Sequence, residues 1–313
     1  MTTTLASPRP SETATDPWLP AVAEVAAELG SRQPLTHMRS LEIHSFYGDE
    51  CPHTLRAIGR LREIGFQAVG AGRGEPLDLD ALDRGPGCYG QLLAWDPQQQ
   101  EIVALYRYQL GARAATFGDG CLRTRTLFDY SPEFREVMLP FAIELGRSVV
   151  NRAARRQSLG FFAIWAGLGA LLRTHPECRY FFGNVSLYQS MQSSARDLLI
   201  RWLEHHYGPG TPLLAARQGL GYQPAEDNSP VPAAVAPGAD DTPENRIARL
   251  RELMAAAGER IPPVMQSYMA LSNQIWCGQT VLDADFGDAL EIGIIVPVAT
   301  INDSVRQRFI DRD

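Results

Sequence analysis

Three carboxylates lie close together after a segment that contains two glycines. Asp78, Asp80 and Asp83 fall within six residues and follow Gly72 and Gly74. Negative charges held this close together are costly unless they cap a helix, bind a cation or meet a positively charged substrate. Asp80 and Asp83 also have the spacing of a helix N-cap with a capping-box-like turn. The sequence therefore predicts either a helix start or a site for a cationic ligand here.

A second candidate is the charged pair Glu144 and Arg147, which interrupts an otherwise apolar run from Phe141 to Val150. Charges inside a buried strand must be paired or functional. Residues three apart on a regular strand face opposite ways, unless a bulge at Gly146 turns one of them around. The pair indicates either a functional site or a structural ion pair with other elements.

A third candidate is a group of arginines just before a helix expected to begin near Ser158. They are Arg147, Arg152, Arg155 and Arg156. Arginines at a strand-to-helix turn, together with the free N–H groups of the helix, can bind a phosphate or pyrophosphate. Gln157 and Gly160 loosely match the Q/R-x-x-G opening of pantetheine-phosphate loops. The alternative is a solvated basic turn.

A fourth candidate is His44 with Asp49, an H-x-x-x-x-D spacing. In glycerophosphate-type acyltransferases this spacing supplies a base and the residue that orients it. The Pro-Glu-Gly motif of those enzymes does not follow downstream. This pair would carry an O-acyltransferase activity on a lysophospholipid, which we keep as an alternative.

Composition excludes several other chemistries. All 29 basic residues are arginine, so P-loop, pyridoxal-phosphate and kinase-type sites, each of which needs a lysine, are ruled out. The net charge of −7 argues against a nucleic-acid binder. Five cysteines without a C-x-x-C pair favour a reducing compartment and no zinc knuckle. We expect no metal and no bound cofactor.

The hydrophobic pattern predicts the elements that position these residues. Helical spacing covers residues 18–29, 52–64, 159–173, 194–205, 245–257 and 262–275. Strand-like runs cover 89–95, 102–109, 141–150, 179–185 and 291–298, and the first two form a hairpin. A hairpin followed by a strand–helix–strand unit predicts a mixed α/β sheet.

The composition also suggests how the chain is divided. Residues 1–17 are expected to be a flexible tail, 18–207 the core, 208–244 a Pro/Ala/Gly-rich loop or linker, and 245–313 a C-terminal segment, partly helical, that packs back on the core. The longest uncharged apolar run, 159–172, is too short to span a bilayer. A cytoplasmic protein, or one peripheral to the inner membrane, is the expectation.

A series of sequence blocks recurs in a known order: Arg56-Ala-Ile-Gly-Arg60 through Phe66, Leu77–Asp83, Tyr89–Asp96, Val103–Arg107, Glu144–Ser148, Trp165–Leu168 and Tyr180–Ser186. The order of these blocks resembles the bacterial hemolysin-like N-acyltransferases of the GNAT superfamily, which include the ornithine-lipid and glycine-lipid synthases. The likeness covers about residues 52–206, and more loosely 261–288. Acyl-homoserine-lactone synthases resemble it more distantly, through Asp80/Asp83 and Glu144/Arg147.

The resemblance implies an α/β (α+β) fold with a mixed, mostly antiparallel central sheet flanked by helices. It also implies transfer of a fatty acyl chain from the phosphopantetheine thioester of an acyl carrier protein to the amine of an amino acid. Glu144, with Arg147, is then the first candidate for deprotonating the amine. Backbone N–H groups near residues 147–149 would stabilise the oxyanion. The acceptor would be held by Asp78, Asp80, Asp83 and Arg107. The donor would be held by Arg152, Arg155, Arg156, Gln157, Trp165 and Ser186, and carrier-protein docking adds Arg173.

The sequence also departs from the family pattern. Relatives read Tyr-Gln where this chain has Ala154-Arg155, Trp-Lys-Gly where it has Trp165-Ala166-Gly167, and Gly-Pro-Val-Ser where Asn184 replaces the proline. The Pro-rich insertion before residue 245 is longer than expected. These departures point to an altered donor or acceptor, or to a catalytically degenerate acyl-binding or regulatory protein.

Overall fold

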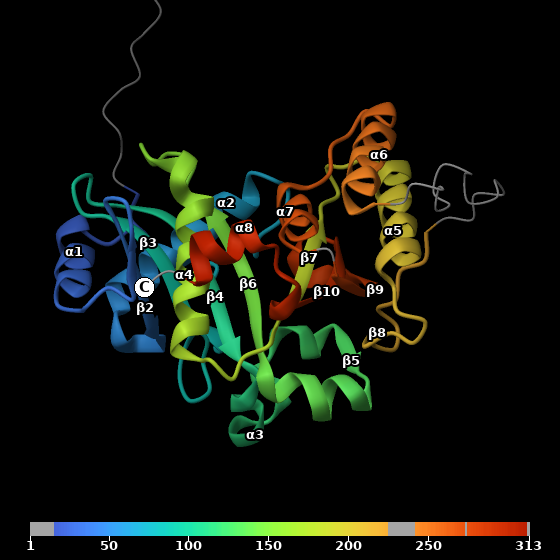
Figure 1. The fold of residues 1–313 in the computed structure, drawn as a ribbon. Coiled ribbons are helices and arrows are strands. Elements are labelled where there is room, and N and C mark those ends of the chain that lie inside the picture. The colour runs from blue at the N-terminus through green and yellow to red at the C-terminus, as the bar shows by residue number, and fades with distance from the viewer. Residues whose placement is uncertain (1–15, 225–241, 273, 312–313) are drawn as a thin grey trace, which may run out of the picture.

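The computed structural model describes residues 16–224, 242–272 and 274–311, and its centre is an eight-stranded sheet (Figure 1). The predicted tail and most of the predicted linker, residues 1–15 and 225–241, lie outside the described residues. All neighbouring strands of the sheet are antiparallel except β6 and β7. In spatial order the strands are β1 (Thr36–Met38), β2 (Leu41–Tyr47), β3 (Gly90–Asp96), β4 (Glu101–Leu110), β6 (Ala142–Val150), β7 (Tyr180–Leu187), β10 (Ala289–Pro297) and β9 (Trp276–Asp283).

Helices cover both faces of this sheet. On one face, α1 (Val22–Gly30) and α2 (Pro52–Gln67) pack their apolar residues against β2, β3 and β4. A larger buried cluster joins the other face to α4 (Gln157–Thr174), α5 (Ser193–Tyr207), α6 (Pro243–Ala256) and α7 (Pro263–Leu271). Two short helices, α3 (Ala114–Phe117) and α8 (Asp303–Val305), complete the set. The predicted mixed, mostly antiparallel sheet flanked by helices is confirmed.

Several elements have different bounds from those predicted. Helix α2 runs past Gly65 to Gln67. A Cβ at residue 65 would lie 2.9 Å from the Val149 side chain, so glycine here lets the helix pack closely on β6 rather than ending it. Helix α7 ends at Leu271, and residues from Trp276 onward form β9, where a helix to 275 was expected. The pattern also missed β1 and β2 near the N-terminus.

Part of the segment predicted as a loop or linker is ordered against the core. Leu214–Ala216 forms β8, which pairs with β5 (Phe128–Tyr130) in a separate two-stranded sheet. Leu213 and Leu214 are both buried, so this short apolar stretch is fixed by packing against the core. No helix in the described ranges is both long enough and apolar enough to cross a membrane.

The main sheet splits between its two parallel strands. β6 and β7 pair only over Ala142–Leu145 with Tyr180–Gly183. At the last pair a Cβ on residue 183 would come within 2.4 Å of the Leu145 carbonyl oxygen, so only glycine allows the strands to meet this closely. Beyond this point β6 continues alongside β4, and β7 continues alongside β10. The inner edges of the two strands are therefore free to line a cleft.

Candidate active site

A small polar chamber lies where β6 and β7 separate. Its volume is about 130 Å³, and charged or polar side chains from seven segments line it beside aromatic rings. The chain segment 262–264, just before and within α7, closes one side. The polar and charged residues of its wall are Tyr89, Tyr106, Arg107, Arg123, Glu144, Arg147, Ser148, Asn184, Ser186, Tyr188, Asp283 and Glu291.

A bulge in β6 places Glu144 and Arg147 in the same chamber. On β4, Leu105 and Arg107 are separated by one residue, whereas their partners Val149 and Gly146 are separated by two. Arg147 is the residue that absorbs the irregularity, with a left-handed φ of 54°. The bulge considered from the sequence is therefore present, and both side chains face the cleft rather than opposite sides of the sheet.

Glu144 is fully buried and holds a neighbouring segment in place. One oxygen accepts the backbone N–H of Thr124 at 2.6 Å, and the other accepts the N–H of Arg123 at 3.2 Å and the Tyr89 hydroxyl. Burial raises the pKa of Glu144, and these donors oppose the rise by stabilising its charged form. Its proposed role as the base stays a prediction, while its anchoring of residues 123–124 is observed.

Arg147 is held by contacts on one part of its guanidinium group. Its Nε lies 3.0 Å from an oxygen of buried Asp78, without hydrogen-bond alignment, so the contact is electrostatic. The guanidinium carbon lies 5.5 Å from the centre of the Phe66 ring and 4.3 Å from the centre of the Phe286 ring, within the range of a cation–π contact. Burial lowers the pKa of Arg147. No residue in the described part of the chain forms a hydrogen bond or ion pair with its two terminal nitrogens, which leaves them available to an anionic ligand.

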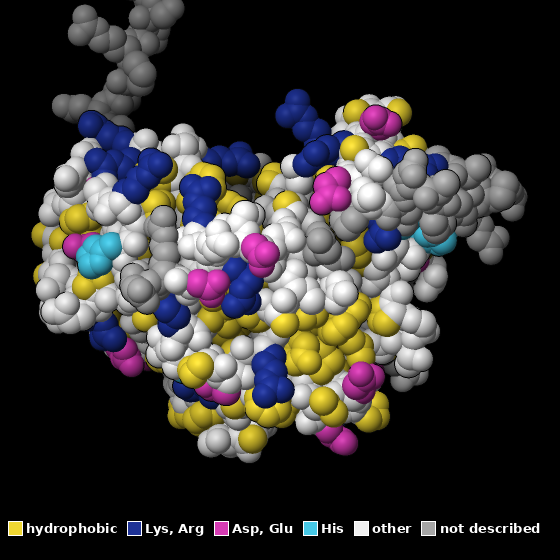
Figure 2. Space-filling view, viewed as in Figure 1, with side chains coloured by type: hydrophobic (Ala, Val, Ile, Leu, Met, Phe, Trp, Pro, Cys, Tyr) yellow, Lys and Arg dark blue, Asp and Glu magenta, His cyan; other side chains and the backbone are white. Residues whose placement is uncertain are grey.

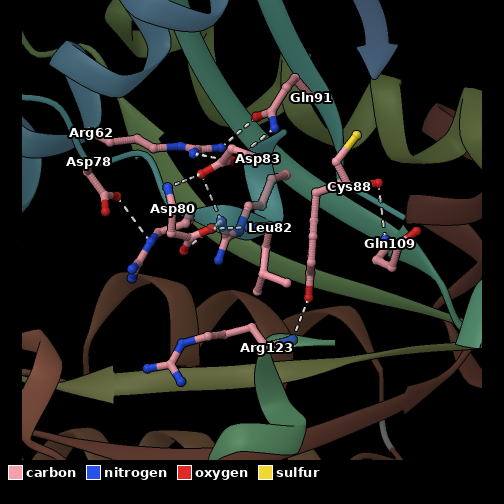
Figure 3. Close-up of polar contacts among 12 residues, drawn as sticks. Arg62, Asp78, Asp80, Leu82, Asp83, Cys88, Gln91, Gln109 and Arg123 are labelled. Atoms are coloured by element: carbon pink, nitrogen blue, oxygen red, sulfur yellow. Dashed lines mark hydrogen bonds and ion pairs between the residues drawn. The ribbon is translucent and has the colours of Figure 1, made fainter. Parts of the chain in front are cut away.

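The other two predicted acceptor carboxylates form a buried network with arginines (Figure 3). Asp83 contacts Arg62 at 2.9 Å and Arg107 at 3.1 Å, and these arginines hold its pKa well below the usual range. Asp80 also meets Arg107 at 3.1 Å and caps the short turn 81–83 by accepting the Leu82 N–H. The capping-box geometry suggested by the sequence is thus observed. Binding of the acceptor by these carboxylates stays a prediction, and each of them already faces an arginine.

Sequence reasoning missed Glu291, a second buried carboxylate of the chamber. It lies on β10 opposite Ser186 of β7, whose hydroxyl donates to it at 2.7 Å. The Asn184 side-chain amide donates to its other oxygen. Burial raises the pKa of Glu291 to about 7. The available signal was the one used for Glu144, a carboxylate within an apolar strand.

Two larger cavities adjoin the chamber. One, of about 640 Å³, runs along β6 to the β6–α4 turn and is lined by Leu61, Ile64, Phe66, Val149, Arg152 and Gln157 among others. The second, of about 1070 Å³, lies between α4, α7 and the C-terminal residues and is lined by Phe161, Phe162, Leu271, Val305 and Phe309 among others. Trp165 borders both cavities, and Ser186 borders the chamber and the larger cavity. All three spaces share Tyr188 and Pro263 in their walls.

The predicted donor arginines do not all behave alike. Arg152 and Arg155 are exposed at the β6–α4 turn, and Arg152 with Gln157 borders the 640 Å³ cavity. Arg156 instead turns away to Asp96 at 3.3 Å and to Gln98 at 2.9 Å, which ties the turn to the β3–β4 hairpin. Arg173, at the far end of α4, donates to the carbonyls of residues 309 and 310. Phosphate binding by this turn stays a prediction.

The structure separates the alternative pair His44 and Asp49. The buried His44 ring contacts Glu42 at 3.1 Å, whereas exposed Asp49 lies 3.5 Å from Arg84. Burial lowers the pKa of His44. The two residues therefore do not form the base and orienting carboxylate that an O-acyltransferase reading requires.

Comparisons with known proteins identify the family of this chain. The model of the "Acetyltransferase (GNAT) domain" family matches residues 61–165. A glycine N(alpha)-acyltransferase of Bacteroides thetaiotaomicron is 33% identical over 287 residues, which cover 89% of this chain and 84% of the relative. One of the same name from Phocaeicola vulgatus is 33% identical over 295 residues, covering 91% and 89%. The chain belongs to this family of GNAT N-acyltransferases. The predicted family and its N-acyltransferase activity are confirmed.

Solved structures give a weaker likeness. A CoA-dependent acyl-homoserine lactone synthase with SAM and isopentyl-CoA is 16% identical, with a TM-score of 0.31, and the match covers 57% of this chain and 76% of the synthase. The same kind of enzyme with MTA is 12% identical, with a TM-score of 0.35 and coverage of 85% and 88%. Similarity at this level supports no inference about the site of this family member.

Proposed function

We propose that this N-acyltransferase moves a long fatty acyl chain from the thioester of an acyl carrier protein to the amine of glycine, giving an N-acylglycine, a lyso-aminolipid. The observation that carries the proposal is that a 130 Å³ polar chamber adjoins two mainly apolar cavities, of 640 and 1070 Å³, and shares wall residues with both. A polar chamber beside apolar cavities suits a reaction between a small polar acceptor and a donor with a long apolar chain. The names of the two relatives support glycine as the acceptor.

The chamber suits a small amino acid. Its volume of about 130 Å³ leaves little room for a side chain on the acceptor. Arg147 reaches into it with two terminal nitrogens that can bind both oxygens of a carboxylate. The acceptor carboxylate then fixes the molecule so that its amine points toward the split in the sheet.

The donor fits along β6 and α4. The pantetheine arm would lie in the 640 Å³ cavity, which has Ser148, Asn151 and Gln157 among its polar lining residues, with its phosphate near the exposed Arg152 and Arg155. The acyl chain would occupy the 1070 Å³ cavity. The thioester would then lie where both cavities reach the chamber.

The β6–α4 turn, which carries Arg152 and Arg155, provides a docking surface for an acidic carrier protein. Figure 2 shows basic side chains along the upper edge of this face, above the place where β6 ends and α4 begins in Figure 1. The chain has a net charge of −7, so a local basic surface is what an acidic partner needs for attraction.

The acyl transfer, at the point where β6 and β7 separate, needs few protein groups. The acceptor ammonium loses a proton, its nitrogen attacks the thioester carbonyl, and the tetrahedral intermediate expels the pantetheine thiolate. Beyond Leu145 the inner edge of β6 has no partner strand among the described residues, so backbone N–H groups near 147–149 can stabilise the oxyanion. No group of His, Cys, Asp or Glu in the described residues is arranged to hold a metal ion.

The proposal is tested with purified protein, palmitoyl carrier protein and a panel of acceptors: glycine, ornithine, glycinamide and a lysophospholipid. We expect an N-acylglycine by mass spectrometry, with little product from ornithine because of the chamber's size. Palmitoyl-CoA, which lacks the carrier protein, should be a poorer donor. An ester product would favour O-acyl transfer, and binding without any product would favour a degenerate acyl-binding protein. Either result would overturn the proposal.

A further inference from the structure

Glu291 lies at the chamber wall in a position that the rest of the site does not explain. It is 1% exposed and belongs to β10, an otherwise apolar strand that is hydrogen-bonded to β7 on one side and to β9 on the other. It lines the same chamber as Arg147, which is the cation suited to the acceptor carboxylate. A buried carboxylate without an arginine in direct contact is costly, so it needs another reason to be there.

The hydrogen bonds of Glu291 leave part of its carboxylate available. Ser186 donates to one oxygen and Asn184 to the other, and a carboxylate has about four acceptor positions. Glu144 already accepts three donors, two of them backbone N–H groups of its anchored segment. Of the two glutamates, Glu291 thus has more capacity to accept a further N–H from a ligand in the chamber.

The charges around Glu291 suit a group that takes up and releases a proton near neutral pH. Burial is the largest effect and raises its pKa to about 7, Ser186 and Asn184 oppose the rise, and Asp283 adds to it. A proton acceptor works best with a pKa near the working pH. The titratable and charged groups facing it are Asp283 on β9, Tyr188 after β7, Arg123 before β5, and Glu144 and Arg147 across the chamber on β6.

We propose that Glu291, held in place by Ser186 and Asn184, is the proton acceptor for the amine of the acyl acceptor. This inference rests on the proposed function and adds to it the identity of the base. Glu291 is the catalytic residue, because it touches the reacting amine. Ser186 and Asn184 are positioning residues that fix its carboxylate and favour its charged form.

The proton balance of the step is complete with the groups present. The acceptor ammonium gives one proton to the Glu291 carboxylate, and the neutral nitrogen forms the C–N bond to the thioester carbon. When the C–S bond breaks, the second proton on nitrogen goes to the departing thiolate. Glu291 then releases its proton to water, which leaves one amide, one thiol and one free proton for each turnover.

The test compares three variants in the purified full chain, with the wild type as the reference: Glu291→Gln, Glu144→Gln and Asn184→Ala. The rates of N-acylglycine formation are measured as functions of pH, with thermal unfolding as a check on folding. For the wild type, kcat/KM should fall as the pH drops below about 7. Glu291→Gln should lower kcat by roughly 10²–10⁴-fold. The remaining rate of Glu291→Gln should rise with pH, because a growing fraction of glycine in solution already has a neutral amine and needs no base.

Asn184→Ala keeps the carboxylate but removes one donor to its charged form. We expect the fall of kcat/KM at low pH to move to higher pH by about one unit, because the charged carboxylate loses a stabilising donor. A merely structural role for Asn184 would lower the rate without changing the pH at which kcat/KM falls. If Glu291→Gln keeps the wild-type rate and pH profile while Glu144→Gln loses them, Glu144 is the base and the inference is wrong. If the wild type forms no amide at all, the proposed function has failed instead.

Discussion

The substitution Ala270→Phe should shorten the acyl chain that the enzyme prefers. Ala270 lies on α7 and lines the 1070 Å³ cavity, away from the chamber and from the 640 Å³ cavity. It is exposed to this space rather than packed in the core, so a phenyl ring can enter the cavity without displacing buried side chains. The ring would occupy the region assigned to the end of the acyl chain.

The size of the effect follows from the apolar surface lost. Each methylene that can no longer be buried forfeits about 0.8 kcal/mol. If the ring displaces the last four methylenes of a palmitoyl chain, the loss is about 3 kcal/mol, or roughly 200-fold in kcat/KM. A lauroyl chain ends before the ring and should lose little.

The assay compares kcat/KM for lauroyl and palmitoyl carrier protein with glycine in excess. The matched control is Ala248→Phe, which adds the same ring to an exposed position of α6 outside these cavities. We expect the ratio of palmitoyl to lauroyl activity to fall only for Ala270→Phe. An unchanged ratio would contradict the assignment of the 1070 Å³ cavity to the acyl chain.

Three further predictions concern the acceptor, the carrier protein and stability. Arg147→Gln should raise KM for glycine by one to two orders of magnitude, while leaving the rate with glycinamide, which has no carboxylate, far less changed. The double reversal Arg152→Glu with Arg155→Glu should raise KM for acyl carrier protein but not for acyl-pantetheine, as measured by steady-state kinetics. Asp83→Asn should cost about 3–5 kcal/mol in urea unfolding, because it removes the carboxylate that faces buried Arg62 and leaves buried Arg107 with Asp80 alone. Since the pKa of Asp83 is lowered on folding, the stability it contributes is present above its unfolded pKa of about 3.9 and is lost as the pH falls below it.

Each of these predictions has an outcome that contradicts it. Equal losses with glycine and glycinamide would remove Arg147 from carboxylate binding. An unchanged KM for carrier protein, or an equal rise for acyl-pantetheine, would move the docking surface away from the β6–α4 turn. A urea midpoint for Asp83→Asn equal to that of the wild type would mean that the buried ion-pair network contributes little to stability.

The sequence predicted the part of the site that depends on local patterns. The apolar runs interrupted by Glu144 and Arg147 marked a buried strand with charges, and the glycine between them marked the bulge. The hairpin of β3 and β4 and the β6–α4–β7 unit followed from alternation and helical spacing. These features are decided by residues near one another in the chain.

The parts that the sequence did not predict depend on contacts between distant segments. Glu291 joins the chamber only because β10 pairs with β7, far earlier in the chain. Asn184, visible beforehand only as a departure from the family pattern, has a physical partner once that pairing exists. Likewise, Arg156 belongs to a basic run in sequence, yet its guanidinium is bound by the β3–β4 hairpin.

The product that the protein makes in a cell tests the proposed N-acyl transfer most directly. The decisive measurement is to express it in a host that lacks aminolipids and to search the lipid extract by mass spectrometry for amide-linked species absent from a vector control. We predict an N-acylglycine with a long acyl chain as the new lipid. A new ester lipid, or an extract identical to the control despite folded protein, would contradict the central claim.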